Sequence, residues 1–149
     1  MQCNSRGIAI IKHYEGFYST PYKCPAGLWT FGYGNIRDKE GQRVTADTAP
    51  ISDLEGEMLL MEELDTVEGQ IKRLAVIPLT ENQFSAICSL VWNIGSGRFK
   101  ASTLRAKLNR GDYEGASAEF PKWRRGGGRI LPGLVRRRKS ERELFETTI

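Results

Sequence analysis

The sequence predicts a mixed fold, in which a small β-sheet lobe near the N-terminus precedes a larger helical lobe. Residues 17–34 are rich in aromatic side chains interrupted by glycine and proline, which is typical of short twisted strands joined by tight turns. From residue 52 onward, apolar side chains instead recur every three or four positions, the period of an amphipathic helix. A chain of 149 residues is long enough for one globular domain of this kind.

Capping signals locate the helices along the chain. Ser5 is a suitable N-cap for a short amphipathic helix that Gly16 would end. Ser52 and Glu55 form a capping box, and the apolar period then continues for about six turns before Pro78. The apolar positions expected on the buried face of this long helix are Leu54, Met58, Met61, Leu64, Val67, Ile71 and Leu74. Further helices are predicted from Thr80 to Ile94 and near residues 103–108, 113–120 and 132–145.

We expect a single domain with three parts. They are an N-terminal lobe over about residues 13–51, an inter-lobe helix over about 52–74, and a helical lobe over about 75–149 that also includes the first helix, 5–14. The acidic face of the long helix suits a connection between lobes, while its periodicity fits an ordinary bundle helix equally well. No internal repeat or low-complexity linker interrupts this organisation.

Composition excludes several classes of protein. With 40% hydrophobic and 27% charged residues, the chain is neither disordered nor embedded in a membrane. It contains no stretch of ~18 apolar residues, and its N-terminus lacks the basic and apolar regions of a signal peptide. We therefore expect synthesis in the cytoplasm without an export signal.

The number and spacing of cysteine and histidine residues argue against disulfide bonds and structural metal sites. The three cysteines, Cys3, Cys24 and Cys88, show no paired spacing, and His13 is the only histidine. This pattern predicts reduced thiols, no disulfide framework and no zinc site, and we expect neither a metal nor a cofactor. Cys88 lies in an apolar run and is expected in the core.

Charge is distributed unevenly behind the formal net charge of +4. Residues 47–68 contain eight acids and no base, whereas residues 122–142 contain nine bases and one acid. The basic stretch raises the alternative of nucleic-acid binding. However, aromatic residues that could stack on a base are missing near these arginines apart from Trp123, and an acidic polymer other than nucleic acid explains the same charge.

Three residues between positions 15 and 30 form the candidate site. Glu15 ends the first predicted helix, where the helix dipole and neighbouring aromatic side chains both disfavour its charged form. A carboxyl group in that environment can act as a general acid near neutral pH. Cys24 and Thr30 follow at fixed intervals, ahead of a Gly-Tyr-Gly turn. Taken singly, these residues would be a surface acid, a packed thiol and a strand residue, so their joint spacing is what indicates a site.

The spacing Glu-x8-Cys-x5-Thr, followed by Phe-Gly-Tyr-Gly, resembles the active-site signature of the phage-type lysozymes, the endolysins of glycoside hydrolase family 24, including those of lambdoid phages. Helical segments of the same family are similar, in the same order, to LTENQFSAICSLVWNIGSGRF, STLRAKLNRGDY, FPKW and GLVRRRKSERELF. The resemblance therefore covers nearly the whole chain. It implies an α+β, lysozyme-like fold whose small sheet lobe and larger helical lobe, joined by a long helix, border an active-site cleft.

The resemblance also implies an activity and roles for individual residues. Phage-type lysozymes are muramidases that hydrolyse the β-1,4 bond between N-acetylmuramic acid and N-acetylglucosamine in peptidoglycan. By matched position, Glu15 is the general acid, Thr30 holds the attacking water, and Cys24 occupies a place where the family more often has aspartate. Asn35 also departs from the family, which commonly has histidine after Gly-Tyr-Gly. The implied substrate-binding residues are Asn93, Gly95, Gly133, Arg136 and Arg137.

As a phage endolysin, the protein is expected to work as a monomer on peptidoglycan, with no nucleic-acid partner and no stable membrane insertion. It would be made in the host cytoplasm and depend on a holin for access to the periplasm and cell wall at lysis. Two alternatives stay open. A lytic transglycosylase would cleave the same bond without adding water, and a decayed site would leave a non-catalytic module that binds the wall or nucleic acid.

Overall fold

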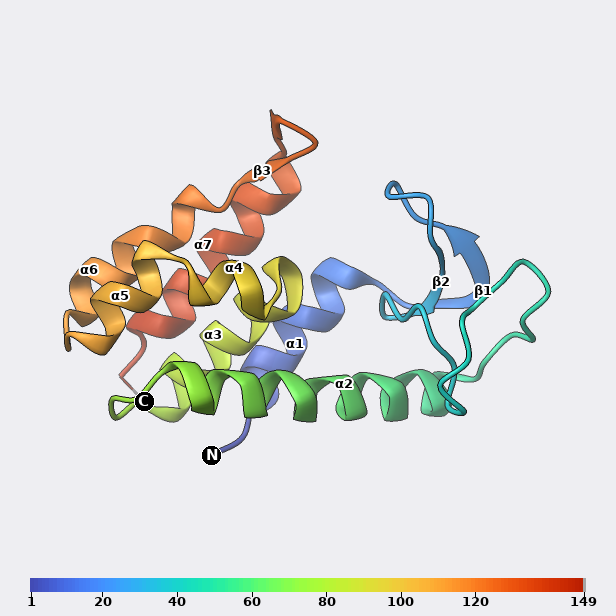
Figure 1. The fold of residues 1–149 in the computed structure, drawn as a ribbon, viewed down its shortest axis with the longest axis horizontal. Helices are drawn as coiled ribbons and strands as arrows, with labels where there is room; N and C mark the ends of the chain where they lie inside the picture. The colour runs from blue at the N-terminus through green and yellow to red at the C-terminus, as the bar shows by residue number, and fades with distance from the viewer. Residues whose placement is uncertain (149) are drawn as a thin grey trace. The chain divides into compact units, whose positions relative to one another are not determined.

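A computed structural model describes residues 1–148 of the chain (Figure 1). Most of its elements are helices, and its strands are short and paired in two antiparallel hairpins. Within these residues, no helix is long and apolar enough to cross a membrane. In chain order the elements are α1 (Ser5–Glu15), β1 (Tyr18–Lys23), β2 (Trp29–Gly32), α2 (Asp53–Leu74), α3 (Glu81–Ile94), α4 (Ser96–Lys100), α5 (Thr103–Asn109), α6 (Tyr113–Glu119), the 3-10 helix η1 (Phe120–Lys122), β3 (Arg125–Gly126), β4 (Arg129–Ile130) and α7 (Pro132–Glu146).

The described residues form two compact units. The sheet unit comprises Glu15–Asp65, and the helical unit comprises residues 1–14 together with residues 66–148. Both boundaries fall within helices, because Glu15 is the last residue of α1 and α2 continues on both sides of the second boundary. The candidate acid and the first half of the long helix therefore belong to the sheet unit.

The sheet unit is built on one antiparallel hairpin, in which β1 pairs with β2. The register places Tyr22 opposite Thr30, and it is irregular between Tyr18 and Tyr22. Phe31 of β2 is fully buried. It packs in an apolar cluster with Val44 and Leu59, against which Trp29 and Ile51 also pack. Since this cluster ties β2 to α2, it anchors the strand that carries Thr30.

A second contact joins the start of the sheet unit to α2. Gly56 is buried, and a side chain at this position would collide with the ring of Phe17. The Phe17 ring also packs at a tilt on Tyr33, with ring centroids 5.4 Å apart. The glycine at position 56 therefore allows the segment that follows Glu15 to lie directly against the helix backbone.

The helical unit is organised around α3, whose residues 84–91 are all buried. This helix packs along α7, while α5 packs against α6. A capping box starts α3: the Thr80 hydroxyl accepts a hydrogen bond from the Gln83 backbone, and the Gln83 side chain accepts one from the Thr80 backbone. A helix that is buried on every side is expected at the centre of a bundle, as observed here for residues 84–91.

The predicted helices are confirmed, with differences in detail. The N-cap of α1 is Asn4 rather than Ser5, because the Asn4 side chain accepts hydrogen bonds from the backbone of Arg6 and Gly7, each at 3.1 Å. The sequence prediction misses α4, the 3-10 helix η1 and the strands β3 and β4. Helix α4 begins at Ser96, between Gly95 and Gly97, and these two glycines had indicated the end of a helix rather than the start of one. The glycine run at 126–128, which had indicated a flexible connection, lies at the turn of the β3–β4 hairpin.

The buried face of α2 differs from the predicted one. Leu54, Met58 and Met61 are exposed, Leu54 by as much as 71%, so the prediction for these three residues is wrong. Leu59 and Leu60 are buried instead, and Leu59 belongs to the apolar cluster beneath β2. Periodicity identifies apolar positions but does not show which of them another element covers. The predicted positions that are buried are Leu64, Val67 and Ile71.

Candidate active site

Glu15, the predicted general acid, is the last residue of α1 and is partly buried. Gly16 follows with a φ of 72°, a left-handed conformation that ends the helix and redirects the chain toward β1. The Glu15 carboxylate lies against the turn after β2, since a Cβ added at Gly34 would stand only 3.1 Å from its Oε1. The Gly-Tyr-Gly motif thus makes room for the acid as well as turning the chain.

Cys24 and Thr30 lie together at the turn that joins β1 to β2. The Thr30 hydroxyl donates a hydrogen bond to the Leu28 carbonyl at 3.0 Å, and the Cys24 backbone N–H donates to the same carbonyl at 2.9 Å. The Gly27 N–H closes the turn by donating to the Cys24 carbonyl at 2.8 Å. One backbone carbonyl therefore fixes both candidate residues, and Thr30 is left only 3% exposed.

The Cys24 thiol is more acidic than an ordinary cysteine. Hydrogen bonding with the Leu28 backbone is the largest influence on it, and together with the Ala26 backbone it lowers the pKa of the Cys24 thiol, although burial opposes the shift. A lowered pKa increases the fraction of thiolate at neutral pH. The hydrogen bonds of this turn therefore favour the negatively charged form of Cys24, which occupies the position where the family more often has aspartate.

Tyr22 is a neighbour of the candidate residues that the sequence does not single out. Burial raises the pKa of the Tyr22 hydroxyl, and negative charge on Tyr18, Cys24 and Glu15 raises it further. The same tyrosine thus lies within electrostatic range of both Cys24 and Glu15. Its register position opposite Thr30 places it there, whereas in the sequence it is one of several strand aromatics.

Glu63, on α2, is the second residue that sequence reasoning misses. Its carboxyl group loses part of its hydration even though the residue as a whole is exposed, and this burial raises the pKa of Glu63. The charge of Glu15 raises that pKa further, while a hydrogen bond from Asn35 opposes the shift. The Asn35 Nδ2 donates to Glu63 Oε2 at 3.0 Å across a separation of 28 residues. No local pattern could have distinguished Glu63 within a run of acids.

The predicted substrate-binding residues belong to the helical unit, whereas the three candidate catalytic residues belong to the sheet unit. Asn93, near the end of α3, is exposed, and its Oδ1 accepts a hydrogen bond from Arg138 Nη1 at 2.9 Å. Gly95 is exposed between α3 and α4 with a φ of 88°. Gly133 and Arg136 lie in the first turns of α7, where Arg136 is exposed.

Arg137 differs from its neighbour because it is only 2% exposed. Its Nη2 donates to the Ser89 carbonyl at 3.1 Å, its Nε lies 3.2 Å from Glu141 Oε2, and its guanidinium lies over the Tyr14 ring. The structure therefore gives Arg137 a packing role between α7 and α3. Of the two predicted arginines, Arg136 is the one that reaches solvent.

A buried ion cluster of Arg137, Arg138 and Glu141 fastens α7 to α3. Glu141 is fully buried and accepts hydrogen bonds from Ser89 Oγ at 2.6 Å, Arg138 Nη2 at 2.9 Å and Arg137 Nε at 3.2 Å. Arg138 in turn donates to Asn93, so the cluster also orients a predicted substrate-binding side chain. The signal in the sequence was the spacing of three and four residues between the bases and the acid on one helix.

Comparison with known families matches residues 12–141 to the family described as phage lysozyme. An endolysin of Acyrthosiphon pisum secondary endosymbiont phage 1 is 43% identical over 152 aligned residues, which cover 99% of both chains. The endolysin of Salmonella phage P22 is 36% identical over 97% of this chain and 98% of its own length.

Solved structures agree with these relatives. A crystal structure of a P22 lysozyme mutant superposes with a TM-score of 0.87 at 35% identity, covering 99% of both chains. The muramidase domain of SpmX from Asticaccaulis excentricus superposes with a TM-score of 0.85 at 29% identity, covering 98% of both chains. These similarities confirm the α+β, lysozyme-like fold that the sequence predicts.

Proposed function

The chain belongs to the phage lysozyme family, and from this premise we propose that Glu15, Cys24 and Thr30 are its catalytic residues. Family membership makes the protein a glycoside hydrolase of the lysozyme type, an endolysin that acts on bacterial peptidoglycan. The bond it hydrolyses is the β-1,4 bond between N-acetylmuramic acid and N-acetylglucosamine.

One observation carries the proposed roles: a single compact unit holds the carboxyl group, the thiol and the hydroxyl, each against a specific turn. Glu15 lies against the Gly34 turn, and Cys24 and Thr30 share the Leu28 carbonyl. Glycoside hydrolysis needs a proton donor on one side of the bond and a group that handles water or positive charge on the other. These residue types supply both functions.

Glu15 acts first, in its protonated form. It donates its proton to the glycosidic oxygen while the bond between that oxygen and the anomeric carbon breaks, so the leaving sugar departs as a neutral alcohol. The Gly34 turn keeps the acid at a defined position, because a side chain there would stand within 3.1 Å of Oε1. Positive charge then develops on the ring that remains.

Thr30 and Cys24 act on the water. Because the Thr30 hydroxyl donates its hydrogen bond to the Leu28 carbonyl at 3.0 Å, its oxygen can accept a hydrogen bond from water. That water adds to the anomeric carbon and gives its proton to the Cys24 thiolate, whose formation the surrounding hydrogen bonds favour. One molecule of water is thereby consumed for each bond broken.

The remaining roles follow the family resemblance. Asn93, Gly95, Gly133 and Arg136 contact the sugar chain from the helical unit, and Arg137 contributes by holding α7 in place. The enzyme works as a monomer, binds no nucleic acid, does not insert stably into membranes, and passes from the host cytoplasm to the periplasm and wall with the help of a holin.

A turbidity assay on permeabilised Gram-negative cells tests the assignment of Glu15. Glu15→Gln should lower the rate of lysis at least ~100-fold, because glutamine cannot donate the proton. Glu40→Gln, a change of the same chemistry at an exposed loop residue of the same unit, should leave the rate unchanged. A folded Glu15→Gln enzyme that lyses cells at the wild-type rate would refute the proposal.

Mass spectrometry of the products separates hydrolysis from transglycosylation. Hydrolysis leaves a reducing sugar, whereas a lytic transglycosylase leaves an anhydro sugar that is lighter by one water. Anhydro products would show that Thr30 does not deliver water. Binding to the wall without any cleavage would instead favour the non-catalytic module.

A further inference from the structure

The segment that precedes α7 forms a short β-hairpin with a distinctive composition. We define the cationic hairpin as residues 124–131, which contain β3 and β4. Arg125 pairs with Ile130 and Gly126 with Arg129, and the Leu131 N–H donates to the Arg124 carbonyl at 3.0 Å. Gly127 and Gly128 form the tip with φ angles of 58° and 79°, which only glycine adopts readily. The tip is therefore bare backbone.

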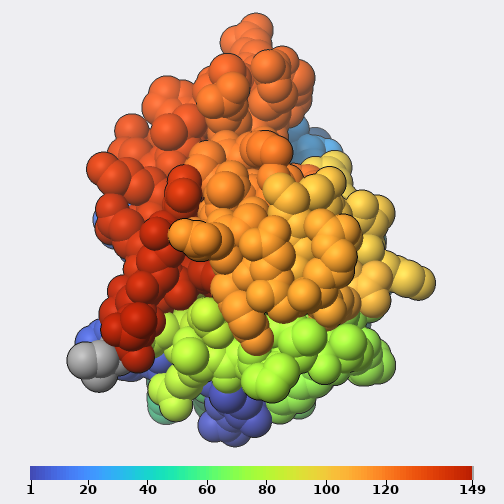
Figure 2. All heavy atoms as spheres, turned by 90° about the vertical axis from the view of Figure 1, so that its left-hand side faces the viewer, coloured from blue at the N-terminus to red at the C-terminus, as the bar shows by residue number. Residues whose placement is uncertain are grey.

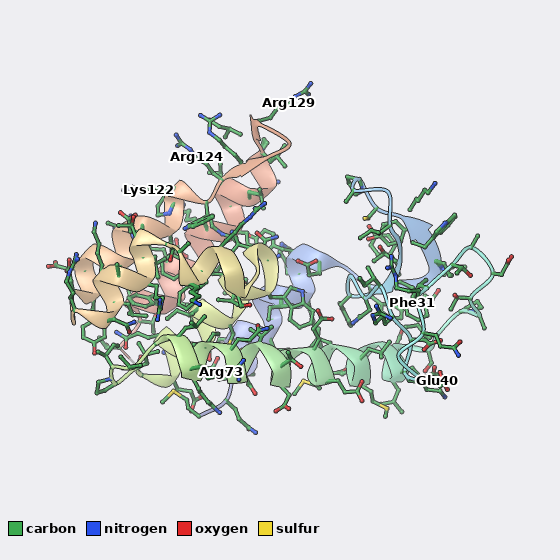
Figure 3. The ribbon with its side chains drawn as sticks, viewed as in Figure 1. Phe31, Glu40, Arg73, Lys122, Arg124 and Arg129 are labelled. Carbon is green, nitrogen blue, oxygen red and sulfur yellow. The ribbon has the colours of Figure 1, made fainter. Side chains whose placement is uncertain are left out.

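The hairpin concentrates positive charge without compensation. Arg124, Arg125 and Arg129 are all exposed, and none of them forms an ion pair within residues 1–148. The sequence contains no acid between Glu119 and Glu141. Figure 3 shows Arg124 and Arg129 pointing away from the helices of their unit, and Figure 2 shows this segment standing out at its top. These cations therefore face solvent.

Exposed apolar side chains lie beside these arginines. Ile130, Leu131 and Val135 expose 47%, 39% and 44% of their surface. The strand register places Ile130 across from Arg125, and the Leu131 N–H bonds to the Arg124 carbonyl, so two of the three arginines have an apolar neighbour on the opposite strand, while Arg129 faces Gly126. Val135 continues the apolar surface one turn into α7, where its N–H donates to the Leu131 carbonyl at 3.0 Å.

We propose that the cationic hairpin docks on the surface of an anionic phospholipid bilayer. Guanidinium groups would bind the lipid phosphates, and Ile130, Leu131 and Val135 would enter the boundary between headgroups and acyl chains. The bare glycine tip allows close approach to the surface, and the arginine stems extend over apolar surface while their heads stay hydrated. This is peripheral docking, and it is independent of the catalytic proposal.

Duplex nucleic acid and the glycan of the wall fit this surface less well. Binding to nucleic acid would leave the three exposed apolar residues without a partner, and residues 124–131 contain no aromatic side chain that could stack on a base. Glycan strands of the wall offer carboxylates but no apolar layer. A lipid surface satisfies both the charge and the apolar component.

Co-sedimentation of the full-length protein with vesicles tests the proposal. The protein should bind vesicles of phosphatidylglycerol mixed with phosphatidylcholine and not bind vesicles of phosphatidylcholine alone. The double variant Arg124→Glu, Arg129→Glu should bind the anionic vesicles at least ~30-fold more weakly, since each cation near such a surface strengthens binding about fivefold. Its rate on soluble peptidoglycan fragments should be unchanged.

A matched variant controls for net charge. Arg73→Glu, Arg110→Glu changes the charge by the same amount at two other exposed positions of the helical unit, and it should keep at least about a third of the wild-type affinity because attraction is screened beyond ~10 Å. Ile130→Ser tests the apolar contact, and it should weaken binding severalfold even at high salt, where attraction between charges is screened.

Three outcomes would overturn the proposal. Equal binding to neutral vesicles would remove the role of lipid charge, and equal losses in the two double variants would reduce the effect to net charge. Tight binding to duplex DNA at 0.15 M salt that the Arg124→Glu, Arg129→Glu variant abolishes, without vesicle binding, would assign the hairpin to nucleic acid instead.

Discussion

The helical unit and the sheet unit surround a glutamate carboxyl group with different partners. Glu141 is fully buried, which raises the pKa of its carboxyl group, and Arg138, Arg137 and Ser89 oppose that rise by donating hydrogen bonds to its Oε2. Glu63 has Asn35 as its only hydrogen-bond partner among the described residues, and it faces the like charge of Glu15. The first arrangement suits packing, and the second keeps ionisable groups poised for a change of charge.

The thiols show the same contrast. Hydrogen bonding in its turn lowers the pKa of the Cys24 thiol in the sheet unit. In the helical unit, a hydrogen bond with Cys3 and burial raise the pKa of the Cys88 thiol and keep it neutral. Identical side chains are thus reactive or inert according to the turn or core that surrounds them.

The largest expected effect concerns the stability of the buried ion cluster. Glu141→Gln should lower the free energy of unfolding by about 3–5 kcal/mol, because two guanidinium groups would stay buried without a carboxylate. Urea denaturation followed by circular dichroism measures the change. Glu143→Gln, an exposed position on the same helix, should have almost no effect. A loss below about 1 kcal/mol for Glu141→Gln would mean that the cluster is not a stabilising feature.

The next effect concerns catalysis at Cys24. Cys24→Ala should lower the rate of wall lysis at least ~10-fold, because the water would lose its proton acceptor, whereas Cys24→Asp should retain substantial activity. Turbidity assays with both variants and with Cys88→Ala as a control decide the matter. Full activity in Cys24→Ala would leave Glu15 and a water held by Thr30 as the whole catalytic apparatus.

Alkylation should distinguish the thiols more finely. Iodoacetamide at pH 7 should modify Cys24 several times faster than an ordinary peptide thiol and leave the folded core thiol at Cys88 intact. Because the pKa of Cys24 is lowered, the rate should stay high to a lower pH than for a free thiol and then fall as the thiolate is protonated. Mass spectrometry of digested protein locates the label. Equal labelling of Cys24 and Cys88 would contradict the contrast.

The smallest effect concerns Glu63. A raised pKa in the folded protein means that folding is favoured most when this carboxyl is protonated, and that the advantage is lost as pH rises through the pKa of the folded state. Glu63→Gln keeps a carbonyl that can accept from Asn35 and removes the titration, so the variant should gain stability relative to wild type between about pH 4 and pH 7. The gain should stay below about 1 kcal/mol because the residue is exposed.

Thermal denaturation of both proteins across this pH range measures the difference. Glu62→Gln, an exchange at an exposed acid in the middle of the same helix, serves as the control. A difference that does not change with pH would show that Glu63 is not coupled to its surroundings as the structure indicates.

Local chemistry made much of the molecule predictable. Capping residues and apolar periods locate the helices because both act over a single turn, as the Thr80 capping box shows. The candidate catalytic residues were also within reach, since Glu15, Cys24 and Thr30 lie on one short stretch whose spacing is itself the signal. Glycines at 16 and 34 belong to the same stretch, where a positive φ is needed.

Only the tertiary structure decided which side chains meet across long separations and which apolar positions are covered. Asn35 forms a hydrogen bond with Glu63 across 28 residues, and Ser89 forms one with Glu141 across 52. Leu54 is exposed although it follows the same apolar period as buried residues of its helix. A sequence pattern reports interactions that repeat within a turn of helix or a pair of strands. Burial, pKa and ion pairing depend instead on neighbours that the chain brings together by packing, and so they were settled by the fold.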